Sequence, residues 1–268
     1  MRTVIALAIL VFGGLGPIAR MACGQVVGGE AVYYDPDSKS SKPAPGVRIY
    51  LISGQYSPGN GVPTDGRIRD ETYSASTAGG ADANDIGTFA LSSKDNNAQV
   101  TLLYYPYDPN GNPTNPGLLA SLVTPKLQAS IDGTPKAQVR LNCTTTSARI
   151  TSEKRVTALI ERAYIAREWA SKLDYGQDVR EKVFQRELAI IASMVDQPDK
   201  YPGIIDRSIS ALKTNGICRQ EEIEGISKTL FGLDAKRREE IRRYHLDSWS
   251  RIKATDFHKM DFEKDFRK

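Results

Sequence analysis

The chain has 268 residues, of which 40% are hydrophobic and 25% charged, a composition that is typical of globular proteins and excludes wholesale disorder. Its formal net charge is +4, and Arg2 and Arg20 contribute two of those positive charges from a segment that we expect to be removed. A charge this small gives no reason to expect nucleic-acid binding.

Residues 1–24 predict a secretory signal peptide. A basic second residue precedes an apolar run over 4–12, and small residues stand just before Gln25, where we expect cleavage. Glycine and proline end the run before the roughly 20 residues that a membrane-spanning helix needs. A lipoprotein signal ending at Cys23 is the less favoured alternative, because Arg20 stands where that signal prefers leucine. We therefore expect an exported protein, periplasmic, cell-surface or secreted, whose mature chain has no transmembrane segment.

Residues 25–148 predict an antiparallel β-sandwich domain, because short alternating segments are separated by turn-rich loops and no helical period interrupts them. In KAQVRLN, residues 136–142, apolar and polar side chains alternate as in a half-buried strand. The preceding Asp132–Gly133 dipeptide is typical of a tight hairpin. The strands that we expect span residues 26–34, 46–53, 72–77, 87–92, 98–106 and 136–142.

The segment DANDIGTF, residues 82–89, alternates acidic and amide residues as a calcium-binding loop does. A loop of the EF-hand type that starts at Asp82 also needs an oxygen ligand at its fifth position and a bidentate glutamate at its twelfth. Isoleucine and serine stand there, so we expect a structural turn and no metal site.

Tyrosine is the most distinctive residue type of this half, and aromatic side chains on one sheet face can stack on sugar rings or anchor a protein partner. Tyr50, Tyr73 and Tyr104 are our candidates for such a binding face, with an envelope protein or a glycan as the partner. The alternative is that these tyrosines are ordinary strand residues at half-buried positions.

The pattern changes near residue 150, after which apolar residues recur at steps of three and four. We expect helices over residues 151–173, 177–195, 202–213, 219–231 and 234–252. Their short connections favour a small all-α bundle over 150–252 with a core of its own, followed by a charged tail over 253–268. The fold class is therefore α+β, built as two domains.

Cys143 and Cys218 remain after removal of the leader, and in an oxidising compartment they can pair and join the two halves of the chain. A disulfide needs Cα atoms within about 7 Å of each other, so free thiols are the alternative. The cysteines and histidines have no short ligand spacing, and we expect neither a zinc site nor a cofactor.

The sequence contains no dinucleotide fingerprint, phosphate loop or metalloprotease helix. His245 has Asp247 and Ser248 close by, but residues this near on one helix face different directions, so no catalytic triad is expected. His258 lies in the charged tail. We therefore expect a non-enzymatic protein. The alternative is an envelope hydrolase, directed at carbohydrate or peptide, whose carboxylates are brought together by the fold.

Three segments resemble the carboxypeptidase regulatory-like, or transthyretin-like, β-sandwich modules of secreted proteins. VVGGEAVYYD (26–35) is similar to the opening strand of that family, PAPGVRIYLI (43–52) to its Pro-Gly turn and second strand, and DANDIGTFAL (82–91) to its Asp-x-x-Gly-x-Phe turn. The resemblance extends over about residues 25–107. It is interrupted by a long Gly/Pro-rich insertion, so a related immunoglobulin-like sandwich is the alternative.

This resemblance implies particular roles in the turn. Asp82 orients the turn, Gly87 takes the tight backbone position, with a positive φ angle, and Phe89 enters the core. Together with the expected leader and the lack of a catalytic constellation, the resemblance predicts for the whole chain an exported, non-enzymatic binding or structural protein of the cell envelope or the secreted fraction.

Overall fold

The computed structural model describes residues 25–35, 38–44, 46–57, 59, 67–73, 87–93, 100–115, 117–126, 128–129 and 135–254. Side chains at 72–73, 128–129, 135–136 and 251–254 are outside this description. The expected leader, the calcium-like residues 82–86, His258 and most of the charged tail fall outside it too. Within the described part of the chain, no helix is both long enough and apolar enough to cross a membrane.

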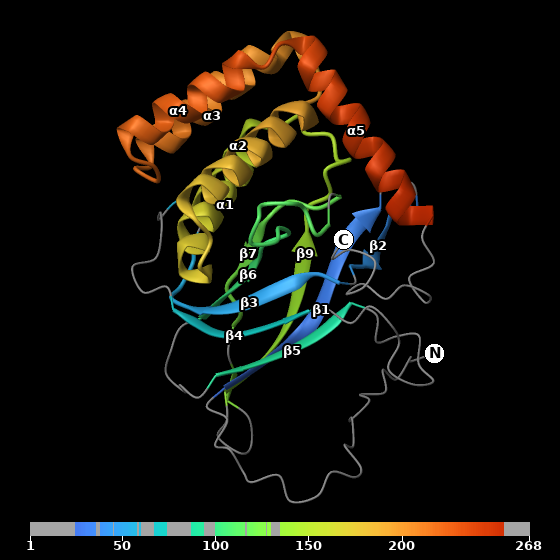
Figure 1. Ribbon diagram of the computed structural model, residues 1–268, viewed down its shortest axis with the longest axis vertical. Helices are drawn as coiled ribbons and strands as arrows, with labels where there is room; N and C mark the ends of the chain where they lie inside the picture. The colour runs from blue at the N-terminus through green and yellow to red at the C-terminus, as the bar shows by residue number, and fades with distance from the viewer. Residues whose placement is uncertain are drawn as a thin grey trace, which may run out of the picture.

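Nine described strands form two sheets that face each other as a β-sandwich (Figure 1). One sheet contains β1 (Gln25–Asp35), β2 (Ser40–Pro43), β5 (Thr88–Ser93), β8 (Gln128–Ala129) and β9 (Pro135–Cys143). The other has the order β4 (Ile68–Tyr73), β3 (Arg48–Ser53), β6 (Val100–Tyr104), β7 (Ser121–Val123). Strands β2, β7 and β8 were not predicted, and β4 begins before the expected segment 72–77.

Strand β1 organises the first sheet. Its first half pairs with β5 and its second half with β2, both antiparallel, while its other edge pairs with β9 in parallel. The sandwich is therefore not wholly antiparallel, contrary to the prediction. Gly29 allows the parallel pair to approach closely, because a Cβ atom at this position would lie 1.9 Å from the Val139 carbonyl oxygen.

Strands β3 and β6 of the second sheet are buried on both faces, which makes this part of the sheet the middle layer of the molecule. Side chains alternate along β3, so Ile49 and Leu51 enter the core of the sandwich while Tyr50 and Ile52 enter the core beneath the helices. A strand covered on both sides is apolar along its centre, as residues IYLI at 49–52 of β3 are.

Five α-helices follow in the described part of the chain, and their number and the breaks between them agree with the predicted helical segments. They are α1 (Glu153–Ala170), α2 (Gln177–Met194), α3 (Tyr201–Thr214), α4 (Gln220–Gly232) and α5 (Ala235–Ala254). Short 3-10 turns at Ser171–Leu173 and Pro198–Lys200 connect the first three. Glycine, proline and aspartate mark the connections, as expected from their backbone preferences.

The helices do not have a core of their own, so the prediction of separate cores is wrong. Trp169, Ile160 and Leu188 belong to the same buried cluster as Tyr50 and Leu103 of the middle sheet. Figure 1 shows α5 leaving the other helices and running down toward β1 and β2. There Trp249 joins the sandwich core, with its ring edge-on to Tyr33 at a centroid distance of 4.7 Å.

Candidate functional site

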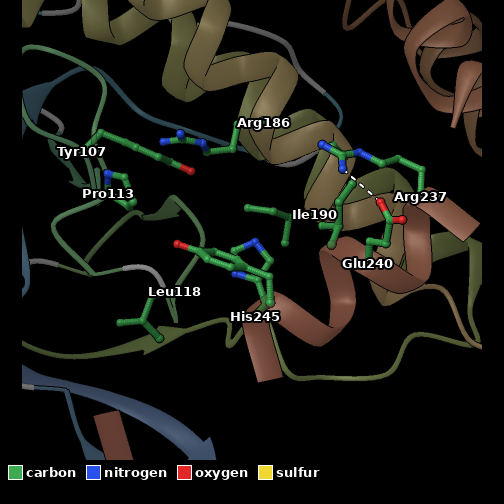
Figure 2. Close-up of a pocket in the computed structure, with 11 residues that line it drawn as sticks. Tyr107, Pro113, Leu118, Arg186, Ile190, Arg237, Glu240 and His245 are labelled. Carbon is green, nitrogen blue, oxygen red and sulfur yellow. Dashed lines mark hydrogen bonds and ion pairs between the residues drawn. The ribbon is translucent and has the colours of Figure 1, made fainter. Parts of the chain in front are cut away.

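A pocket of about 490 Å³ lies where α2 and α5 meet the segment that follows β6 (Figure 2). The segment contributes Tyr107, Pro113 and Leu118, α2 contributes Arg186, Ala189 and Ile190, and α5 contributes Arg237, Glu240, Ile241, Tyr244 and His245. Both halves of the chain therefore build this pocket, and it exists only when they are folded together.

Helical periodicity explains which side chains reach the pocket. The α2 residues are three and four positions apart, and those of α5 follow Arg237 by three, four, seven and eight positions. Each set therefore lies on one face of its helix. Figure 2 shows Tyr107 and Pro113 on the opposite side of the pocket from Arg237 and Glu240.

The pocket wall combines positive charge with apolar surface. Nη1 of Arg186 donates a hydrogen bond of 2.9 Å to the Gly111 carbonyl oxygen. Nη1 of Arg237 lies 3.1 Å from Oε2 of Glu240. Isoleucine and leucine side chains from α2, α5 and the loop supply the apolar surface. Such a lining suits a small molecule that carries both an apolar part and an anionic group.

His245 is buried in this wall, with 7% of its surface exposed and its ring edge-on to Tyr244 at 5.2 Å. Its sequence neighbours do not join it in a catalytic arrangement. Asp247 faces solvent, and the Ser248 hydroxyl donates to the Tyr244 carbonyl oxygen of its own helix at 2.9 Å. His245 therefore contributes to the lining of the pocket and has no nucleophile beside it in the sequence.

Glu187 is a buried carboxyl group on α2, beside the pocket. One of its oxygens, Oε1, accepts hydrogen bonds from the Tyr107 hydroxyl at 3.1 Å and from the Ala120 amide at 2.9 Å. Burial raises the pKa of Glu187 to about 7. The group thus ties α2 to the middle layer and changes charge near neutral pH.

Glu161 on α1 is a second buried glutamate that also accepts a backbone hydrogen bond from the sandwich. Its Oε1 accepts a hydrogen bond of 2.7 Å from the Gly59 amide. Burial raises its pKa, and the backbone bond from Gly59 opposes that rise. Neither Glu161 nor Glu187 perturbs the other's pKa, so the two do not form the coupled carboxylate pair that the hydrolase alternative requires.

A third group of carboxylates surrounds a buried cation. Arg167, which is buried, lies 2.9 Å from Glu168, 3.2 Å from Glu181 and 2.8 Å from Glu222. Its guanidinium also stacks over the Phe184 ring at 4.6 Å. This cluster joins α1, α2 and α4 and serves their packing.

The tyrosines predicted to form a binding face are not on a surface. Tyr50 and Tyr104 are 1% and 0% exposed, and they lie in different cores on opposite sides of the middle sheet. The prediction of a shared platform is therefore wrong for these two. The backbone of Tyr73 ends β4, but its side chain lies outside the described residues.

Cys143 and Cys218 are both free thiols, so the disulfide that we weighed is not formed. Cys143 lies in the sandwich core, whereas Cys218 lies in the core shared with the helices. Burial raises the pKa of each thiol to about 12, which keeps both neutral at physiological pH.

The turn before β5 has the backbone that its sequence predicts. Gly87 has a φ angle of 84° and Phe89 is 7% exposed. Asp82, the residue expected to orient the turn, lies outside the described residues. In the part of the chain that the structure describes, no group of three or more metal-ligating side chains comes together.

Comparison with known proteins gives little for this chain. No family model matches it, and no curated protein does. Among solved structures, a variant of the shaft pilin SpaA from Lactobacillus rhamnosus GG is 15% identical over 45% of this chain, with a TM-score of 0.28. The unsubstituted pilin is 14% identical over 45% of this chain, with a TM-score of 0.25. A 9R-lipoxygenase from Cyanothece PCC8801 is 8% identical over 56% of this chain, with a TM-score of 0.23.

The alignment spans about half the length of those pilin chains, 50% and 48%, and 24% of the lipoxygenase. TM-scores this low do not establish a common fold, and what those proteins do says nothing about this one. The function is therefore argued from the pocket and its surroundings.

Proposed function

We propose that this protein is an exported, non-enzymatic binding protein of the cell envelope or secreted fraction, and that the pocket between α2 and α5 holds its ligand. The ligand is a small amphipathic anion. Its apolar part packs against Ile190 and Ile241, and its anionic group lies near Arg186 and Arg237. The carboxypeptidase regulatory-like identity of the sandwich is part of this proposal and rests on the three sequence segments.

One observation carries the proposal: two guanidinium groups from different helices line one apolar pocket. Glu240 offsets the charge of Arg237, but Arg186 is held by a neutral carbonyl oxygen. The pocket therefore keeps a positive charge beside apolar surface, an arrangement that favours an anion with a hydrophobic part. A hydrolase is less well supported, because Glu161 and Glu187 are each engaged by backbone amides.

The fluorescent anion 8-anilinonaphthalene-1-sulfonate tests the pocket, since it joins a sulfonate to aromatic rings. We expect saturable binding to the full-length mature protein. Arg237→Gln should weaken it roughly tenfold, because losing one charge-assisted contact costs about 1.5 kcal/mol. Tyr244→Ala should also weaken it, because it removes an aromatic wall of the pocket. Arg243→Gln is the matched control, because Arg243 is an exposed cation on the same helix outside the lining.

Equal affinities for the wild type and the two pocket variants would place the dye elsewhere and contradict the pocket assignment. Hydrolysis of a glycoside or peptide substrate that was lost in Glu187→Gln would instead support the hydrolase. Intact mass of the exported protein tests export itself. We expect a chain that begins at Gln25, whereas diacylglycerol on Cys23 would favour the lipoprotein alternative.

A further inference from the structure

Tyr107 connects the pocket between α2 and α5 to a buried carboxyl group behind the pocket wall. The tyrosine lines the pocket beside Arg186, as Figure 2 shows. Its hydroxyl donates a hydrogen bond of 3.1 Å to Oε1 of Glu187, which is 3% exposed and does not itself line the pocket. One side chain therefore separates this carboxyl group from the space in which we place the ligand.

Helix α2 carries both the carboxyl group and part of the pocket wall. Arg186 and Ile190, which lie one residue before Glu187 and three after it, both line the pocket. The Glu187 side chain is held behind that wall, because the Ala120 amide also donates to its Oε1, at 2.9 Å. A charge on Glu187 therefore has a fixed place close to the pocket, in surroundings where little water screens it.

The charge at this place matters for an anion in the pocket. An ionised Glu187 repels the anion and offsets the attraction of Arg186, whereas a neutral Glu187 does neither. Burial raises the pKa of Glu187 to about 7, so both of its forms are populated near neutral pH. A small change of pH therefore changes the electrostatic field in the pocket.

The other titratable groups that face Glu187 keep a constant charge. Tyr104, Tyr105 and Tyr107 approach it from β6 and the segment after it, and burial is the main cause that raises the pKa of each, so all three stay neutral. Burial and two hydrogen bonds shift the pKa of Glu187 itself, and no charged group on the described residues of α1, α4 or α5 does. His245 lines the pocket from α5 and is the other residue type there that titrates near neutral pH.

We infer that Glu187 couples the pocket to protons: its neutral form admits the anionic ligand and its ionised form releases it. This inference deepens the proposed function and rests on it. Binding of the anion takes up one proton from the buffer, which Glu187 keeps as a carboxylic acid while the ligand is bound. The coupling is reciprocal, because the ligand favours protonation as much as protonation favours the ligand. The pocket therefore binds its ligand in mildly acidic surroundings and releases it above neutral pH.

The test is titration of 8-anilinonaphthalene-1-sulfonate into the full-length mature protein at pH 5.5 and pH 8.5, since its sulfonate is charged at both. We expect the wild type to bind about tenfold more weakly at pH 8.5, the effect of a unit charge one side chain away. Glu187→Gln keeps an acceptor for Tyr107 but cannot ionise, so its two affinities should differ less than about twofold. Calorimetric titration at pH 7, in two buffers with different enthalpies of ionisation, should show proton uptake by the wild type and none by this variant.

Two control variants identify the titrating group. Asp178→Asn removes an exposed carboxylate of the same helix outside the lining, and His245→Gln removes the histidine of the pocket. Whatever their affinities, both should keep the ratio that the wild type shows between the two pH values. Equal affinity of the wild type at both pH values, or an undiminished ratio in Glu187→Gln, would overturn this inference and leave the pocket as the binding site. Absence of saturable binding at both pH values would overturn the proposed function, and this inference with it.

Discussion

At the scale of single residues, Glu187 couples the pocket region to pH. Its carboxyl group accepts from Tyr107 and from the Ala120 amide, and both donors belong to the segment that follows β6. Burial opposes its ionisation, which raises its pKa from 4.5 to about 7. The folded protein therefore holds a proton that the unfolded chain has already released between these two values.

This proton makes stability depend on pH. Because the native state binds more protons between pH 4.5 and about 7, the free energy of unfolding falls as pH rises through that window. Above it, the penalty for the buried charge reaches about 3 kcal/mol, and Glu187→Gln removes it. Urea unfolding at pH 5 and pH 8 should show the variant gaining stability relative to the wild type at the higher pH. A constant difference between the two proteins would show that Glu187 does not titrate in this window.

Gly87 makes a second residue-scale prediction, with a matched control in the same chain. Gly87 and Gly59 have φ angles of 84° and 85°, but a Cβ at Gly87 would lie 2.8 Å from the Ala31 carbonyl oxygen, whereas Gly59 has open space around it. Alanine at Gly59 should cost about 1 kcal/mol through its backbone conformation alone. Alanine at Gly87 should cost at least about 1 kcal/mol more in urea unfolding, and equal losses would contradict the close contact with Ala31.

The tyrosines show where residue-level prediction failed. Tyr104 and Tyr105 belong to different cores, as neighbouring residues of an extended chain do. The sequence does not reveal that the helical layer covers the second face of the same sheet, because that contact joins residues far apart in the chain. The residues of the pocket were missed for the same reason: α2, α5 and the segment after β6 meet only in the folded molecule.

At the scale of elements, the helices were predicted well because local signals define them. Their three- and four-residue periodicity and the glycine and proline breaks are properties of neighbouring residues. The strand partners were predicted less well, since the parallel pairing of β1 with β9 joins residues more than a hundred positions apart. One usable signal was missed: the consecutive apolar residues at 49–52 in β3 and 102–104 in β6 are typical of strands buried on both faces.

Helix α5 supplies the element-scale prediction. Trp249 anchors its C-terminal end in the sandwich core, against Tyr33. Trp249→Ala should therefore lower the free energy of unfolding by about 3 kcal/mol. Leu246→Ala, on the same helix but 36% exposed, should change it by less than about 0.5 kcal/mol in the same urea titration. Similar losses in the two variants would mean that Trp249 does not anchor the helix.

At the scale of the whole molecule, the two halves of the chain form three layers with shared cores. The change of pattern near residue 150 is real, since β9 ends at Cys143 and α1 begins at Glu153. It marks a change of secondary structure, however, and each half lacks part of the core that it needs. We therefore expect that fragments 25–148 and 150–268 do not fold separately, contrary to the sequence-based prediction of two independent domains.

The shared core is the central claim, and the chain's two tryptophans test it directly. Trp169 lies in the core between helices and middle sheet, and Trp249 lies in the sandwich core. In Trp249→Phe and Trp169→Phe, the remaining tryptophan reports one core by fluorescence while far-UV circular dichroism reports the helices. In urea, the two signals should give one coincident transition within each variant, as expected of a single cooperative unit. A fluorescence transition at Trp249 clearly separated from the loss of helix would contradict the account and restore two independent domains.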